Sequence, residues 1–305
     1  MHMPLRYQIK LNARLILKKK WFKAWALILI IYFLCLGVSA LEIGFCNAIG
    51  IKEQTATLDM STVNFKAIAK AYMTYFHQVI NILPVNAVFS AITFLLVAPL
   101  LAGMIEWYWR LTDNKPQGIG DIFAWFGSFR LYIKSLWLFL NLLLRMLPWA
   151  LLTFFLPLCS MLYGFYIYGE SSTLQTMISL LFIGLGELLL IGGAFLFAYI
   201  FSRYFLAVFI FSEDSTRKVN ECVKESVRIS RKIRGEIFKF NLSFLGWFIL
   251  LFLASYALDV LSILPALFVV PYFLASCAVF SKYLIFADRV KGKPDQTQDT
   301  MEFKV

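Results

Sequence analysis

Charged residues are scarce in this sequence: Asp, Glu, Lys and Arg make up 15% of its 305 positions, whereas 60% of the positions are apolar. A soluble domain carries about a quarter charged residues. The shortage of charge excludes an ordinary cytosolic enzyme, and the abundance of Phe, Tyr and Trp (31, 14 and 8 residues) excludes a disordered chain. One water-soluble core of this length cannot hold so many apolar side chains. The composition therefore predicts a protein embedded in a membrane.

The motifs of catalysis and of nucleotide binding are also missing. The chain has two histidines, His2 and His77, and contains no HExxH sequence, no phosphate-binding P-loop and no nucleophile elbow. Its five cysteines form no CxxC pair, so we interpret them as small hydrophobic residues and expect neither a disulfide framework nor a metal site. We therefore expect a protein that is not an enzyme and that carries no cofactor.

Long apolar runs fill most of the chain. A helix needs roughly 20 apolar residues to cross ~30 Å of hydrocarbon at 1.5 Å per residue. The runs that meet this length lie at about 25–45, 79–107, 136–165, 177–211, 238–258 and 263–286. They predict an all-α fold, a polytopic bundle of six transmembrane helices that forms a single helical membrane domain (1–305).

Basic residues are distributed unevenly around these spans. Of the 29 Lys and Arg residues, all but Lys52, Lys66, Lys70 and Arg145 lie in or beside the two chain ends and the second–third and fourth–fifth connections. Because cytoplasmic flanks are enriched in Lys and Arg, we expect both termini to be cytoplasmic. The first span also resembles a signal peptide cleaved after Ala40, but its apolar run continues past that residue, so we favour an uncleaved span.

Three segments beside the spans are amphipathic: residues 5–20, 121–129 and 214–237. Basic residues recur every fourth position in the first, and in the second Asp121 is placed to cap a short interfacial or re-entrant helix. A basic helix on a membrane surface attracts anionic lipid, at ~1 kcal/mol for each basic residue near the headgroups. The candidate lipid- or partner-binding residues are Arg6, Lys10, Arg14, Lys18, Arg228, Arg231, Lys232 and Arg234.

These segments also have a simpler interpretation. Lys and Arg beside span ends are what membrane orientation requires, and amphipathic connectors often only cover a helix bundle. Nucleic-acid binding is not expected, because the basic residues lie beside spans and account for topology. The partners that we expect are membrane lipids, most of all anionic ones, or a membrane-protein partner.

Polar side chains inside the predicted spans form a second candidate site. Arg145 in the third span and Glu187 in the fourth are costly in hydrocarbon unless each meets a partner or water. Counting residues from the short turn between these spans places the two at similar depth, so we expect that an ion pair can form. Asn141 shares the helix face of Arg145. A stripe on the second span adds Asn86, Ser90 and Thr93.

This polar core has two interpretations. It either holds three helices together through interhelical hydrogen bonds, which we favour, or lines a substrate or proton path. Glu42 and Glu106 lie near span ends and need only reach the interface. The fourth span is also rich in glycine, which predicts close helix packing rather than a phosphate loop, because no strand precedes it. The glycines concerned are Gly184, Gly186, Gly192 and Gly193.

Several short motifs carry a family resemblance. In the C-terminal third, the basic stretch 225–235 leads into Phe240-Asn241-Leu242-Ser243-Phe244-Leu245-Gly246-Trp247, and Pro271-Tyr272 lies in the last span. The N-terminal basic helix ending at Trp21 and the run Gly120-Asp121-Ile122-Phe123 complete the set. With these motifs the chain resembles a bacterial multi-pass membrane family, mainly of Firmicutes, known as domain of unknown function nine hundred and seventy-five. The resemblance implies an all-helical protein in the membrane of a Gram-positive type cell, and it implies no catalytic residue.

Two functions are consistent with these features. The first is a non-enzymatic accessory or scaffold that binds anionic lipid or a membrane partner through its amphipathic segments. The alternative is a small transporter, or a lipid- or peptide-handling permease, with a polar path around Arg145 and Glu187. Since the chain has no nucleotide-binding motif, such a transporter needs an ion gradient or a separate ATPase. We favour the first function, because no energising motif is present.

Overall fold

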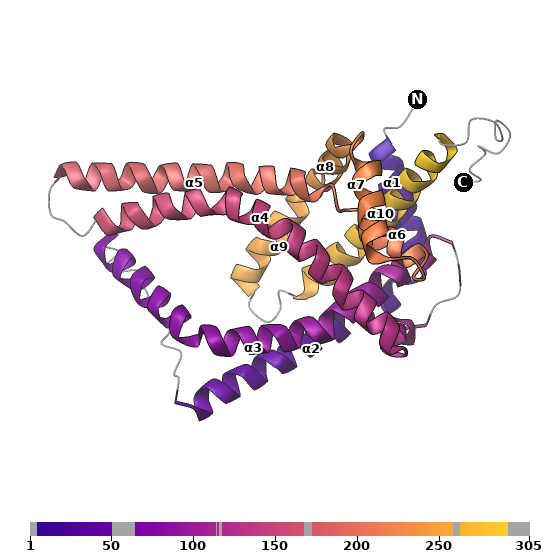
Figure 1. The fold of residues 1–305 in the computed structure, drawn as a ribbon, viewed down its shortest axis with the longest axis horizontal. Helices are drawn as coiled ribbons and strands as arrows, with labels where there is room; N and C mark the ends of the chain where they lie inside the picture. The colour runs from indigo at the N-terminus through magenta and orange to yellow at the C-terminus, as the bar shows by residue number, and fades with distance from the viewer. Residues whose placement is uncertain are drawn as a thin grey trace. The chain divides into compact units, whose positions relative to one another are not determined.

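The computed structural model describes residues 5–50, 65–113, 115, 118–167, 173–258 and 263–291, without the side chains of 65–81, 256–258 and 291. This part of the chain is almost entirely helical and contains no strand, so the predicted all-α class is confirmed (Figure 1). In chain order the elements are α1 (Leu5–Leu17), α2 (Trp21–Ala48), α3 (Phe65–Leu111), the 3-10 helix η2 (Gly120–Phe126), α4 (Phe129–Ile167), α5 (Thr173–Phe201), α6 (Ala207–Glu213), α7 (Val219–Ser230), α8 (Arg234–Leu242), α9 (Leu245–Leu258) and α10 (Ile263–Lys291).

Six helical stretches among the described residues are long and apolar enough to cross a membrane, as the apolar runs predict. They are Trp21–Ala48, Ile82–Leu111, Phe129–Ile167, Thr173–Phe201, Arg234–Ser255 and Ile263–Val290. Even the shortest, with 22 residues, covers ~33 Å at 1.5 Å per residue. The chain is therefore a multi-pass membrane protein. The cytoplasmic location of its termini stays a prediction.

The fourth span is shorter than predicted. Helix α5 ends at Phe201 rather than at residue 211, and the chain turns before it forms α6. The residues that extend the apolar run are buried in protein, with Phe205 at 9% exposure and Phe211 at 1%. A hydropathy pattern does not distinguish a protein core from lipid, and this is why the prediction was too long. Segment 214–237 is likewise divided, because α8 already belongs to the fifth spanning stretch.

The chain folds into two compact units made of non-contiguous segments. Unit 1 contains residues 1–32, 98–139 and 202–305, and unit 2 contains residues 33–97 and 140–201. The boundaries fall inside α2, α3 and α4 and at the end of α5, so that continuous apolar helices run from one unit into the other. Because composition does not change at such a boundary, the sequence alone predicts a single domain.

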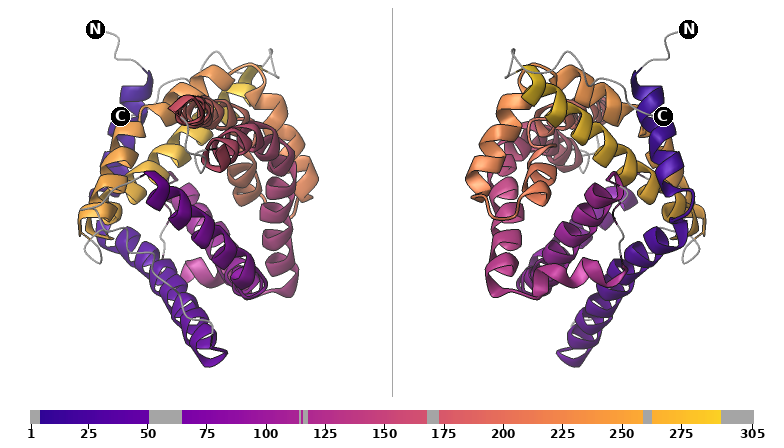
Figure 2. Two further views of the ribbon diagram at one scale, coloured as in Figure 1. Left: turned by 90° about the vertical axis from the view of Figure 1, so that its left-hand side faces the viewer. Right: turned by 90° about the vertical axis from the view of Figure 1, so that its right-hand side faces the viewer.

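Helix α10 lies at the centre of unit 1, where it packs against α1, α6, α7 and α9. Figure 2 shows α1 beside α10. Aromatic rings fill this core: the centroids of Phe240 and Phe280 are 4.3 Å apart, and those of Phe240 and Phe244 are 5.5 Å apart. None of these three side chains is more than 2% exposed. Part of the unusual Phe content therefore builds a protein core by ring packing rather than contacting lipid.

The predicted interfacial segment 121–129 contains most of the 3-10 helix η2, which ends at Phe126 and packs against α3 in unit 1, whereas Phe129 already belongs to α4. Gly103 of α3 permits the contact, because a Cβ atom there would overlap the backbone of η2. One turn later, Glu106 accepts a hydrogen bond from the Trp125 Nε1–H at 2.7 Å. Asp121 does not cap the helix as predicted, since its carboxylate accepts an N–H from the preceding loop instead.

Helices α4 and α5 form a close antiparallel pair in unit 2 (Figure 1). The residues in direct contact pair as Gly164 with Ser179, Pro157 with Gly186, and Thr153 with Gly193. The Ser179 hydroxyl donates to the Gly164 carbonyl oxygen at 2.6 Å. Close packing is thus confirmed for Gly186 and Gly193. It is wrong for Gly184 and Gly192, where an added Cβ atom would meet nothing within 4 Å.

Candidate functional site

Two basic residues of α1 contact the two ends of α8. The Lys10 ammonium lies 4.2 Å from the Phe244 ring centroid and donates at 3.1 Å to the carbonyl oxygen of Ser243, where α8 ends. A cation here satisfies a carbonyl group that the helix leaves unpaired, and it complements the helix dipole. Burial, together with the nearby Arg6 charge, lowers the pKa of Lys10. Arg6 itself forms an ion pair with Glu236 at 2.9 Å.

The remaining basic residues of α1 differ from each other. The Arg14 guanidinium lies 5.5 Å from the ring centroid of Tyr272 on α10. Lys18 is exposed and has no partner in the described part of the chain. Another face of α1 exposes an apolar stripe of Tyr7, Leu11 and Leu15. The basic stripe, predicted as a lipid contact, therefore mainly attaches α1 to α8 and α10.

Helix α7 is amphipathic, as its spacing predicts. Val219, Val223 and Ile229 are buried, each at 5% exposure or less. Cys222 lies on the same face and is fully buried, and this burial raises the pKa of its thiol, so it is not a reactive cysteine. On the outer side, Lys224 is exposed. Helix α7 thus has one buried apolar face that packs against the protein and another face that exposes basic side chains.

The loop between α6 and α7 is held by hydrogen bonds and ion pairs. Lys134 of α4 donates to the loop's carbonyl oxygens, with the shortest bond at 2.7 Å. The hydroxyl and the N–H of Thr216 donate to the Asp214 carboxylate at 2.6 and 2.9 Å, and these bonds lower the pKa of Asp214. Arg217 donates to Glu225, which raises the pKa of Arg217. The acidic groups of this loop are therefore already engaged.

The predicted basic residues around α8 fall into two groups. Arg228 forms an ion pair with Asp288 of α10 at 2.8 Å and lies 4.0 Å from Glu225, so much of its charge is balanced inside the protein. Arg234 is only half-exposed. Arg231 and Lys232 are exposed, and neither has an ion pair or hydrogen bond within the described residues. Only the second group is free to bind a ligand.

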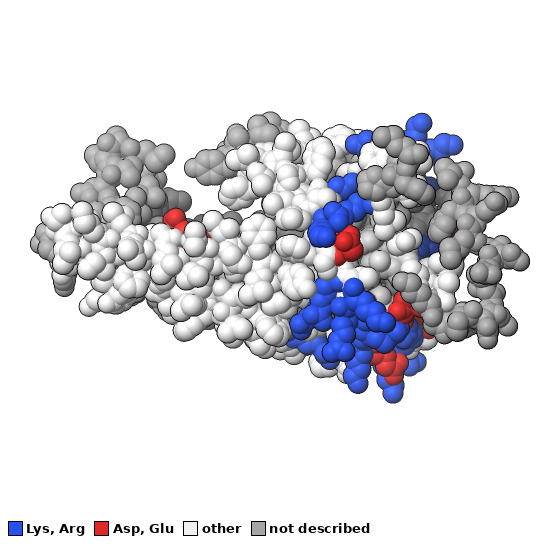
Figure 3. All heavy atoms as spheres, turned by 90° about the horizontal axis from the view of Figure 1, so that it is seen from above, with Lys and Arg blue, Asp and Glu red and all other residues white. Residues whose placement is uncertain are grey.

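We define the basic face as Lys218, Lys224, Arg231 and Lys232. All four side chains are exposed on α7 or directly beside it, and none has a partner among the residues that the structure describes. Figure 3 shows Lys and Arg gathered in a cluster, with Asp and Glu at its edge. Sequence analysis identified Arg231 and Lys232. It missed Lys218 and Lys224, although both belong to the same basic amphipathic segment.

The predicted polar core of the membrane helices is only partly formed. Arg145 Nε donates to the Asn141 side-chain oxygen at 2.7 Å, which agrees with the predicted shared helix face. Glu187 is exposed on α5 and forms no ion pair with Arg145 in the described part of the chain. Its neighbour Gly186 contacts Pro157, and Arg145 lies twelve residues before Pro157 (157 minus 145), or ~18 Å along the helix.

The similar depth predicted for Arg145 and Glu187 is therefore wrong. The helices pair through glycine contacts whose register differs from the count made from the turn. The polar residues predicted as one stripe on α3 also differ in their surroundings. Ser90 is exposed, and the Thr93 hydroxyl donates to the Phe89 carbonyl oxygen of its own helix at 2.9 Å. A transport path around Arg145 and Glu187 loses its main argument, because the two charges do not lie together.

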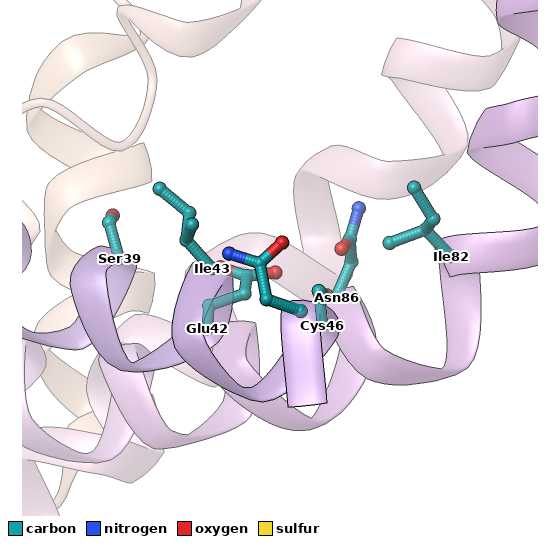
Figure 4. Close-up of a pocket in the computed structure, with 7 residues that line it drawn as sticks. Ser39, Glu42, Ile43, Cys46, Ile82 and Asn86 are labelled. Atoms are coloured by element: carbon teal, nitrogen blue, oxygen red, sulfur yellow. The ribbon is translucent and has the colours of Figure 1, made fainter. Parts of the chain in front are cut away.

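Asn86 lines a pocket in unit 2 that sequence analysis did not predict. The pocket lies between α2 and α3 and has a volume of about 340 Å³. Its lining residues are Ser39, Glu42, Ile43, Cys46 and Asn47 of α2 and Ile82 and Asn86 of α3 (Figure 4). The signal was present on α2, since residues 39, 42, 43 and 46 recur at the spacing of one helix face.

Comparison with known proteins adds no further assignment. No protein-family model, curated protein sequence or solved structure matches the chain. The resemblance to the Firmicutes membrane family therefore stays a prediction that rests on the motifs quoted above. The candidate sites of this protein are therefore the basic face and the pocket between α2 and α3.

Proposed function

We propose that the protein is a non-enzymatic membrane accessory or scaffold that binds anionic lipid headgroups through the basic face. The observation that carries this proposal is the set of exposed basic side chains without a protein partner: Lys218, Lys224, Arg231 and Lys232. Of the nearby acids, Glu225 and Asp288 are occupied by Arg217 and Arg228, whereas Glu221 is exposed on α7 between Lys218 and Lys224 and balances one charge of the face at most. The cations of the basic face are therefore available to a phosphate group from outside.

The magnitude expected from these charges is sufficient for binding. Each Lys or Arg close to an anionic surface contributes about 1 kcal/mol, so four contribute about 4 kcal/mol at physiological ionic strength. This attraction falls off within a Debye length of about 8 Å. The predicted topology supports the proposal, since it locates the basic face at the cytoplasmic leaflet, where anionic lipids are found.

The family resemblance described above suggests the type of cell in which the protein resides. We infer that the protein resides in the cytoplasmic membrane of a Gram-positive type bacterium, with both termini in the cytoplasm. Such a location accounts for the excess of Lys and Arg at the chain ends and in two connections. Labelling of tags fused to each terminus, in intact and in permeabilised cells, tests this topology, and a terminus labelled in intact cells would contradict it.

The lipid proposal is tested on protein extracted from its own membrane under native conditions, followed by identification of co-purifying lipids by mass spectrometry. The test variant carries Arg231→Gln and Lys232→Gln. The control carries Lys19→Gln and Lys20→Gln, which make the same change in net charge at residues outside the basic face. We expect anionic lipid to be depleted only in the test variant. Equal anionic lipid in the test variant, the control and the wild type would contradict the proposal.

A further inference from the structure

The pocket between α2 and α3 contains polar side chains whose hydrogen-bonding capacity is unused. Ser39, Glu42, Asn47 and Asn86 line it, and none of these side chains has a hydrogen bond or an ion pair in the part of the chain that the structure describes. Glu42 and Asn86 are half-buried. Polar groups withdrawn from bulk water are unfavourable unless another group bonds to them. The pocket is thus suited to a polar ligand that forms hydrogen bonds with these groups.

The charge of the pocket restricts the ligand further. Among the residues that the structure describes, Glu42 is the one charged residue in the lining, and none of the described lining residues is Lys, Arg or His. The carboxylate, the two amide oxygens and the Ser39 hydroxyl are all acceptors. An anionic ligand would meet the Glu42 charge, and no described lining residue offers a cation to balance it. The lining therefore favours a cation that carries several N–H donors.

The size and the walls of the pocket argue against a bare metal ion. Its volume of about 340 Å³ corresponds to roughly ten water molecules at ~30 Å³ each and lies near the lower end of small-molecule pockets, at ~300 Å³. Among the described residues, no group of three His, Cys, Asp or Glu side chains could hold a metal ion. Ile43 and Ile82 offer apolar surface to a short carbon chain.

We propose that this pocket binds a primary ammonium group on a short alkyl chain, with the ammonium at Glu42 and Asn86 and the carbon chain against Ile43 and Ile82. In Figure 4 these four side chains are presented by facing helices α2 and α3. The three N–H donors of an ammonium group match the acceptors available. The proposal uses residues of unit 2 only, so it is independent of the basic face in unit 1.

The position of the pocket allows two sources of this group. Glu42 lies six residues before the end of α2 at Ala48 (48 minus 42), or ~9 Å along the helix, so the pocket is near the end of a spanning helix. A water-soluble amine can reach this depth from solution, and the ethanolamine headgroup of a phospholipid can reach it from the bilayer. Both sources supply the same ammonium chemistry.

The test uses the full chain in nanodiscs made of phosphatidylcholine alone, which has no primary amine. Propylammonium and its neutral counterpart 1-propanol are titrated by ligand-observed NMR. Loss of a charge-assisted hydrogen bond lowers affinity by about tenfold or more, so Glu42→Gln should weaken propylammonium binding to that extent. Asn86→Leu, which keeps the branching of the side chain but removes its amide, should also weaken it. The control Glu221→Gln makes the same charge change on α7 and should bind as the wild type does.

Three results would overturn the proposal: no propylammonium binding by the wild type, equal binding by the wild type and Glu42→Gln, or equal binding of 1-propanol and propylammonium. A second set of nanodiscs, in which phosphatidylethanolamine replaces part of the phosphatidylcholine, distinguishes the two sources. Weaker propylammonium binding there identifies the lipid headgroup as the occupant. Unchanged binding identifies a soluble amine.

Discussion

Replacement of two adjacent glycines of α5 measures the packing of the α4–α5 pair. In Gly193→Ala the new Cβ atom would lie 2.6 Å from the Thr153 carbonyl oxygen, whereas ordinary contact begins at 3.4 Å, so the helices must separate by about 0.8 Å (3.4 minus 2.6 Å). A gap of this size forfeits a quarter to a half of the attraction at the contact. Gly192→Ala adds its Cβ atom where nothing lies within 4 Å.

Both variants gain the same helix propensity, about 0.5–1 kcal/mol for Ala over Gly. The difference between them therefore isolates the packing term, which we expect to be about 1–3 kcal/mol in favour of Gly192→Ala. The assay is equilibrium unfolding of the purified protein in mixed micelles, with both variants measured side by side. Equal free energies of unfolding would refute the contact between α4 and α5 at this register.

Three other predictions concern unit 1 and the loop before α7. Gly103→Ala should detach η2 and lower the free energy of unfolding by about 1–3 kcal/mol. Trp125→Phe removes the hydrogen bond to Glu106 and should lower the free energy of unfolding by about 1–2 kcal/mol. Unchanged melting temperatures of both variants would contradict the docking of η2. Lys10→Met should destabilise the protein by about 1 kcal/mol through the lost bond to Ser243, whereas Lys18→Met should change the unfolding free energy by less than about 0.5 kcal/mol. Because Thr216 lowers the pKa of Asp214, the stability contributed by this carboxylate is present above its ordinary pKa of 3.8 and is lost as the pH falls through the lowered value. Asp214→Asn should lack that acid-dependent loss, and a matching loss in an acid titration of the variant would contradict the assignment.

The spanning helices could be predicted from sequence because the bilayer imposes one simple length on each. The same rule failed at the end of α5, where Phe205 and Phe211 are apolar for a different reason, burial in protein. Hydropathy reports removal from water, and a lipid tail and a protein core produce the same signal. The division into two units was also invisible, because it cuts through continuous helices.

The candidate sites depended on information that the sequence does not contain. The spacing of Asn141 and Arg145 within one helix was enough to predict that they share a face, and the structure joins them by a hydrogen bond. The separation of Arg145 from Glu187 depends on the register of two helices, which contacts at Gly186 and Gly193 determine. In the same way, the partners of Lys10 lie more than 200 positions away in sequence. Nothing local distinguishes a cation that holds a helix in place from one that meets lipid.

The central claim, that the basic face binds anionic lipid, is tested most directly by a titration in nanodiscs. A fluorescent phosphatidylglycerol is added to the wild type and to the Arg231→Gln/Lys232→Gln variant in otherwise neutral lipid. At about 1 kcal/mol for each cation, the variant should bind about 30-fold more weakly. The Lys19→Gln/Lys20→Gln control should stay within about twofold of the wild type, because neither residue belongs to the basic face. Equal affinity of the variant and the wild type would contradict the claim.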